Sequence, residues 1–80
     1  MNTFVFKIIT PREVLYQGNC ESAVINASDG LYGIMAGHLP MTAVTVPGEV
    51  KIKENGNTKS FELGNGVFHF ENNEATLIIK

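Results

Sequence analysis

Turn-forming residues recur at short and regular intervals along this chain of 80 residues. Clusters of glycine, proline, asparagine, aspartate and serine interrupt the sequence about every 7 to 10 residues, which is the rhythm of an all-β sandwich or barrel. No stretch carries apolar residues with helical spacing unless a glycine or proline interrupts it. We therefore predict an all-β fold. The clusters lie at residues 11–12, 18–19, 28–30, 37–40, 47–48, 55–57, 64–66 and 72–73.

Between the clusters, apolar and polar residues alternate with the two-residue period of a strand. Residues 49–54 and 58–63 are predicted to form a hairpin around Asn55-Gly56-Asn57, because Asn-Gly tolerates the positive φ of a tight turn. Residues 67–71 and 75–79 are predicted to form a second hairpin around Asn72-Asn73. We expect one domain over residues 1–80, an antiparallel sandwich of two packed sheets.

The alternating pattern also predicts which side chains form the core. In the third strand, residues 20–26, we expect Ala23 and Ile25 on the face opposite Cys20 and Val24. Apolar residues on both faces of so small a domain indicate either an exposed interface or corner strands that switch sheets, and the sequence leaves both open. The predicted core is Phe4, Phe6, Ile8, Val50, Ile52, Phe61, Phe68, Phe70, Leu77 and Ile79.

Composition argues against several classes of function. A single cysteine, Cys20, allows no internal disulfide, and the Cys and His spacing of a zinc site does not occur, so we expect a reducing compartment and no metal. With six basic residues and a net charge of −2, the chain lacks the electrostatic footprint of a nucleic-acid-binding protein. Residues 1–7 do not resemble a signal peptide, and no apolar run approaches the ~20 residues of a membrane span.

The segment from Asp29 to Pro40 has the most unusual local sequence, since Gly30, Gly33, Gly37 and Pro40 surround His38. One interpretation is that the glycines only turn corners between strands. The other is that they present His38 and the pair Leu31-Tyr32 to a partner. For His38 itself, the sequence allows either a hydrogen bond to a backbone carbonyl or a partner contact.

We find no constellation of residues that predicts an enzyme. Cys20 and His38 have no third group to orient the histidine, and His69 lies on the polar face of its strand, where solvent exposure explains it. The glycines of residues 30–37 lack the lysine and the following helix of a phosphate-binding loop. The carboxylates are scattered over turns and outward positions. We therefore expect a non-catalytic protein that binds no cofactor.

A set of ordered residues carries a resemblance that periodicity does not supply. The chain resembles the amino-terminal β-sandwich domain of the epsilon subunit of the F-type ATP synthase, from about Phe4 to Ile79. The run Gly-Ile-x-x-Gly-His-x-Pro at residues 33–40 is the most specific part. The other matching residues are Thr10-Pro11, Gly18, Glu21, Asp29-Gly30, Pro47-Gly48, Val50, Ile52, Gly64, Gly66-Val67 and Asn73.

This resemblance implies a sandwich of about ten short strands on the central rotor stalk. It implies that the domain grips the gamma subunit, rests on the c-ring and couples the two for proton-driven ATP synthesis, without an active site of its own. It also implies a place on the cytoplasmic face of a bacterial inner membrane, reached only through the complex. The implied contact residues are the matched loop and its two central apolar residues: Gly30, Leu31, Tyr32, Gly33, Gly37, His38 and Pro40.

Two departures from the family pattern affect these expectations. Leu31 and Tyr32 stand where relatives often have an acidic residue, so we expect an apolar contact with the c-ring at this position instead of an electrostatic one. The sequence ends at Lys80, whereas relatives usually continue into a helical hairpin that restrains ATP hydrolysis, so we expect this chain to lack that switch and to bind no ATP.

A biotinyl or lipoyl carrier domain is the alternative of similar size. It needs a modified lysine at a hairpin tip, but Lys51 and Lys53 lie inside a predicted strand, and Lys59 lacks the expected flanking residues.

Overall fold

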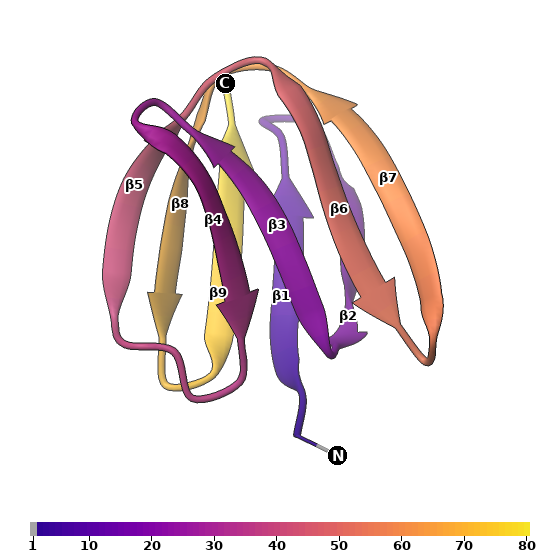
Figure 1. Ribbon diagram of the computed structural model, residues 1–80. Helices are drawn as coiled ribbons and strands as arrows, with labels where there is room; N and C mark the ends of the chain where they lie inside the picture. The colour runs from indigo at the N-terminus through magenta and orange to yellow at the C-terminus, as the bar shows by residue number, and fades with distance from the viewer. Residues whose placement is uncertain (1) are drawn as a thin grey trace.

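The computed structural model describes residues 2–80, and these residues form nine strands and no helix (Figure 1). No helix in this range is therefore long and apolar enough to cross a membrane. The all-β prediction is confirmed, with nine strands where about ten were expected. The strands are β1 (Phe4–Ile9), β2 (Val14–Cys20), β3 (Ser22–Ala27), β4 (Gly30–Met35), β5 (Met41–Thr45), β6 (Gly48–Glu54), β7 (Asn57–Leu63), β8 (Gly66–Glu71) and β9 (Glu74–Ile79).

The strands form one continuous sheet in the order β2-β1-β9-β8-β5-β3-β6-β7, with β4 paired to β3. The sheet curls so that β1, β2, β8 and β9 lie behind β3, β4, β6 and β7 (Figure 1). The two halves are joined where Ala27 pairs with Thr45, flanked by hydrogen bonds from Ser28 N to Val44 O (2.9 Å) and from Val46 N to Asn26 O (3.0 Å). Two separate sheets are thus not confirmed in detail.

One pairing corrects the antiparallel expectation, because β1 and β9 run parallel from Val5–Glu74 to Ile9–Ile78. A parallel pair needs a long connection. Here the seven intervening strands provide it, so this pairing leaves no local signal in the sequence.

Both predicted hairpins are confirmed. Asn55 and Gly56 have φ values of 52° and 79°, and Asn72 and Asn73 have φ values of 53° and 58°. Positive φ at both central residues is the geometry of a type I′ turn, whose twist matches that of paired strands. The sequence positions of asparagine and glycine therefore set the two turns.

The core lies between the two halves of the curled sheet. Nine of the ten predicted core residues are at most 7% exposed, and Phe61 on the edge strand β7 is half-buried against the same cluster. The Phe6 ring packs edge-on against Phe68 at 5.8 Å between centroids, and the Phe4 ring packs edge-on against Phe70 at 5.6 Å. Such aromatic pairs stabilise a core beyond the area that they bury.

At the corner between β2 and β3, the prediction of which side chains lie on the same face is wrong. Cys20, Ala23 and Ile25 are all buried, whereas Val24 is 36% exposed. The chain bends at Glu21, whose N–H donates to Lys53 O at 2.8 Å, and this bend shifts the alternation by one residue. Because β2 and β3 lie in different halves of the sheet, the apolar residues on both sides of this segment reflect a strand that changes halves.

One open side of the curled sheet, between β2 and β6–β7, is closed by side chains. The Tyr16 hydroxyl donates to Glu54 Oε2 at 3.2 Å, and Lys59 Nζ lies 3.1 Å from Glu54 Oε1 and 5.5 Å from the centre of the Tyr16 ring. Burial, together with the Glu54 charge, raises the pKa of Tyr16 to about 12. This cluster holds together two edge strands that share no ladder.

Candidate protein-contact groove

The other open side of the curled sheet is a groove that is lined by β5, by Tyr32 of β4 and by the segments on either side of β4. Its volume is about 540 Å³, and β5 contributes Met41 to Val44 to its wall. The turn Ser28-Asp29 bounds one end, and the loop His38–Pro40 bounds the other. The groove is thus as long as β5 and has a defined end at each side.

At the turn end, Tyr32 projects from β4 toward the interior and packs half-buried against the core. Its hydroxyl donates to Asp29 Oδ2 at 2.9 Å. This hydrogen bond, with the charge of Asp29, raises the pKa of Tyr32. This hydrogen bond holds the Tyr32 ring at the groove wall, and it also uses one carboxylate oxygen of Asp29, the acidic residue that lines the groove.

At the loop end, three hydrogen bonds fix the segment that carries His38. Gly37, at a φ of 84° that favours glycine, donates its N–H to Asn73 Oδ1 at 2.7 Å. The His38 N–H donates to Met35 O at 3.1 Å, and its ring Nδ1 lies 2.8 Å from Leu39 O. Because a carbonyl only accepts, Nδ1 carries the proton.

The His38 ring also packs edge-on against Phe70 at 5.7 Å between ring centres. The predicted bond to a backbone carbonyl is therefore present, while a partner contact stays a prediction.

The structure brings together some of the predicted contact residues and separates others. Tyr32, His38 and Pro40 all line the groove. Leu31 is 71% exposed on the outer face of β4 and lines a separate hollow of about 320 Å³ beside Val24. Of the three glycines, Gly30 and Gly33 belong to the β4 backbone, and Gly37 lies in the loop beyond it. Leu31 and His38 thus lie toward opposite ends of β4 and do not form a single tip.

The sequence did not reveal a row of apolar side chains on the outer face of five adjacent strands. Strand register aligns these side chains one beside the next, and four of them are between 37% and 57% exposed. The register was not predictable because β5–β8 and β1–β9 are distant in sequence. The outer apolar row is Val44, Val67, Ile78, Ile9 and Val14.

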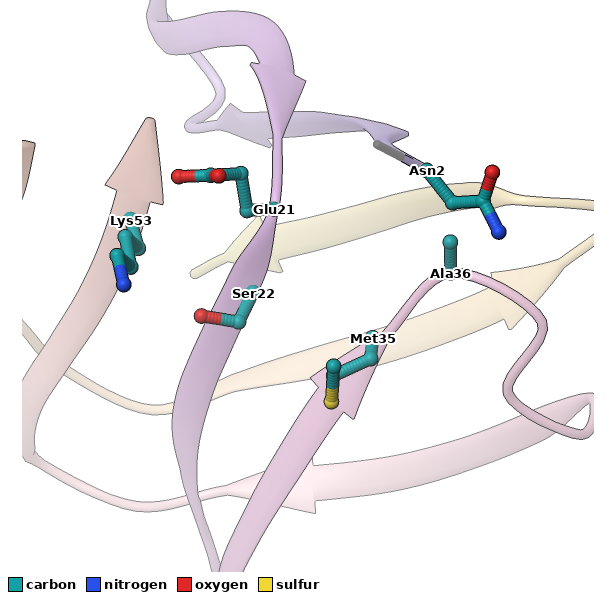
Figure 2. A pocket seen from close by; sticks show the side chains of 6 residues that line it. All are labelled: Asn2, Glu21, Ser22, Met35, Ala36 and Lys53. Atoms are coloured by element: carbon teal, nitrogen blue, oxygen red, sulfur yellow. The ribbon is translucent and has the colours of Figure 1, made fainter. Parts of the chain in front are cut away.

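A further hollow of about 430 Å³ lies where β3 begins and where β4 and β6 end, and Figure 2 shows its lining side chains. Glu21 accepts a hydrogen bond from Gly56 N at 3.1 Å, so its carboxylate serves the neighbouring hairpin turn. Asn2 lies beside Ala36, away from Glu21 and Lys53 (Figure 2). The polar groups of this hollow are therefore spread around its rim.

Two titratable side chains outside the groove, those of Cys20 and His69, are either buried or in contact with neighbouring polar side chains. Cys20 is fully buried, and burial, with a smaller effect of Glu54, raises its pKa to about 12, so the thiol stays protonated near neutral pH. His69 is exposed on the outer face, as predicted, with Nδ1 2.9 Å from Thr42 Oγ1 and Nε2 3.3 Å from Glu71 Oε1. Among residues 2–80, no three histidine, cysteine or carboxylate side chains are grouped as metal ligands.

The family model of the ATP synthase, Delta/Epsilon chain, beta-sandwich domain, matches residues 3–80. The chain belongs to this family. The resemblance that the sequence carries is therefore confirmed, and the carrier-domain alternative is not favoured.

Curated relatives named ATP synthase epsilon chain agree with this assignment. The Ruminococcus albus protein is 31% identical over 84% of this chain and 50% of its own length, and the Caldicellulosiruptor bescii protein is 31% identical over 98% and 57%. The chain spans about half the length of these two relatives. The Chlorobium limicola protein is 32% identical over 94% of this chain, and the match covers 86% of that protein.

Solved structures share the fold. A chain of the Euglena gracilis mitochondrial ATP synthase, OSCP/F1/c-ring, superposes with a TM-score of 0.91 at 16% identity, over 96% of this chain and 50% of that one. A chain of the Tetrahymena thermophila mitochondrial ATP synthase, central stalk/c-ring, gives 0.79 at 17% identity, over 94% and 61%.

Proposed function

We propose that this chain is the β-sandwich part of an epsilon subunit in the central stalk of an F-type ATP synthase. In this role it binds the gamma subunit, contacts the c-ring and couples the two during proton-driven ATP synthesis. The observation that carries the proposal is the family match over residues 3–80, supported by relatives named ATP synthase epsilon chain. The protein would then reside on the cytoplasmic face of a bacterial inner membrane, attached through the complex.

The mechanism we propose is mechanical and involves no catalysis by this chain. An adaptor on a rotor must keep its shape under load, and the two halves of the sheet act as the two layers of a sandwich around a close-packed aromatic core. The side chains of Tyr16, Glu54 and Lys59 close one side of that sandwich. A continuous sheet resists shear better than a single helix would, because many hydrogen bonds share the load.

Two partners require two surfaces, and the chain offers two, which meet at Val44. We propose that one is the groove with Tyr32, His38 and Pro40, together with the β4 backbone at Gly30 and Gly33 and the loop at Gly37. The other is the outer apolar row, with Leu31 as a further exposed apolar contact on the opposite half. Exposed, contiguous apolar side chains on a small domain are characteristic of protein interfaces.

Binding to a purified gamma subunit from the same organism tests this function. We expect stoichiometric binding by titration calorimetry and co-elution in size-exclusion chromatography. Ile78→Asp places a charge in the outer apolar row, and it should weaken binding by at least about tenfold, the cost of one buried charge in an apolar contact. Thr76→Asp is the matched control, because Thr76 lies on the same face of β9 in the adjacent polar row.

If the gamma subunit does not bind, the proposed function is wrong. If the two aspartate variants weaken binding equally, the outer apolar row is not the surface that binds gamma.

A further inference from the structure

The edge strands of this sheet differ in how they are protected from pairing with another chain. Within residues 2–80, β2 and β7 end the sheet, and β4 pairs only with β3. Natural edge strands usually carry charges, prolines or bulges that prevent pairing. Strand β7 carries Lys59 and Glu62, and β2 is irregular opposite Ile8–Ile9 and is covered by the Tyr16–Glu54 contact.

Strand β4 has none of these protections. Its sequence, GLYGIM, contains no charge and no proline, and its outward side chains Leu31 and Met35 are 71% and 63% exposed. A free, uncharged and apolar edge of this kind is a template for a further strand.

Hydrogen bonds at the junction show which backbone groups of β4 are free. Asn26 O accepts from Val46 N, so the Asn26 backbone points away from β4. In an antiparallel pair, its partner Leu31 must then point its own N–H and C=O away from β3. The pattern repeats every second residue, so Gly33 does the same. Leu31 and Gly33 therefore present two N–H and two C=O groups along the free edge.

The surroundings of this edge favour a single extended segment as the occupant. The groove beside β4 runs along β5 between the turn at Ser28-Asp29 and the loop at His38–Pro40, and no lysine or arginine of residues 2–80 lines it, so its chemistry fits an extended, uncharged segment. Its acidic side chain, Asp29, is already bonded to Tyr32, and the remaining walls are mostly apolar or backbone. Strand addition uses backbone hydrogen bonds for affinity and pockets for alternate side chains for specificity.

We propose that β4 is a strand-addition site, at which an extended, uncharged segment of a partner protein pairs with Leu31 and Gly33 along the groove. Alternate side chains of that segment would face Tyr32 and the His38 ring, and the others would lie beside Leu31 and Met35. This inference goes beyond the proposed function, because it concerns how the groove binds and not which complex contains it.

A peptide titration on the isotopically labelled chain tests the proposal by amide hydrogen exchange. The probe is a heptapeptide that alternates threonine and valine and ends in one lysine for solubility. At saturation, we expect the amides of Leu31 and Gly33 to exchange at least about tenfold more slowly, and the Thr42 amide on β5 to be unchanged. The same peptide with two adjacent central residues N-methylated loses a donor on each of its edges, and it should not bind.

A matched pair of variants isolates the backbone donor. A Cβ added at Gly33 meets no atom within 4 Å, and Gly33 is not among the glycines with a positive φ, so Gly33→Ala fits without strain. Proline removes the outward N–H without breaking a β3–β4 bond, and alanine keeps it. We expect Gly33→Ala to bind the peptide as the unaltered chain does, and Gly33→Pro to bind at least about tenfold more weakly.

The N-methylated peptide decides the question even if Gly33→Pro does not fold. Equal binding of both peptides, protection of Thr42 in place of Leu31 and Gly33, or no binding at about 1 mM peptide would overturn the proposal. So would a dimer of this chain that protects Leu31 and Gly33 as its concentration rises, because the occupant would then be a second copy.

Discussion

Replacement of Phe68 by alanine tests whether the core lies where the two halves of the sheet meet. Phe68 is fully buried on β8, between Ala43 of β5 and Leu77 of β9, and its ring contacts that of Phe6 on β1, two strands away in the sheet. The curled sheet cannot collapse freely around the missing ring, because its strands are held by their ladders. We therefore expect a cavity and a large loss of stability.

The size of this loss follows from the burial of the ring. Loss of a fully buried phenylalanine costs about 3–5 kcal/mol, which includes the ~0.5–1.5 kcal/mol of an edge-on aromatic pair. A domain of this length has a total stability of about 4–12 kcal/mol. With an m-value near ~1 kcal/mol per M, the urea midpoint should fall by about 3 M or more, and the variant is expected to be partly unfolded without denaturant if the parent lies at the low end.

Urea unfolding, followed by circular dichroism, measures this change. Val67→Ala is the matched control, because Val67 precedes Phe68 on β8 but points outward and is 37% exposed, so it should cost about 1 kcal/mol or less. A loss below about 1 kcal/mol for Phe68→Ala, or equal losses for the two variants, would show that the ring is not in the core.

Two further predictions concern pH. The pKa of Cys20 in the folded chain is about 12 against an ordinary 9.0, and that of Tyr16 is about 12 against 10.0. The free energy of unfolding should therefore fall as pH rises between 9 and 12. Urea unfolding at successive pH values measures this slope; Cys20→Ala should flatten it, and an unchanged slope would contradict the prediction. The contact with Lys59, followed by that with Tyr16, holds the pKa of Glu54 below 4.5, so stability should fall as pH drops below 4.5, and Glu54→Gln should lose that part of the acid dependence.

The sequence predicted those features that depend on neighbouring residues. The two Asn-containing turns were predictable because the left-handed conformation at Asn55 and Asn72 is a local property. The buried side of each strand followed from period-two alternation, as for Phe68 and Phe70. At Glu21 the chain bends, and this one residue between β2 and β3 puts the Cys20 side chain on the buried side with Ala23 instead of on the opposite face. The sequence contains no glycine or proline at this point that would have predicted the bend.

Features that depend on distant residues were not predictable. The parallel β1–β9 pair and the Ala27–Thr45 junction join segments that no local pattern connects. The groove along β5 exists only once the sheet has curled, so the sequence grouped Leu31 with His38, although the strand between them separates the two. The partner contacts of all the predicted site residues stay predictions.

Cross-linking in the assembled ATP synthase tests most directly whether the groove is a contact surface in the central stalk. In a Cys20→Ala background, Leu39→Cys and Pro40→Cys place a thiol at the loop end of the groove, and Thr58→Cys places one on the exposed strand β7 as a control. With a photoreactive maleimide on membranes, we expect both groove positions to cross-link to the gamma subunit or to a c-ring subunit, and Thr58 to give much less product. Failure of both groove positions to cross-link, or equal cross-linking from Thr58, would contradict this account.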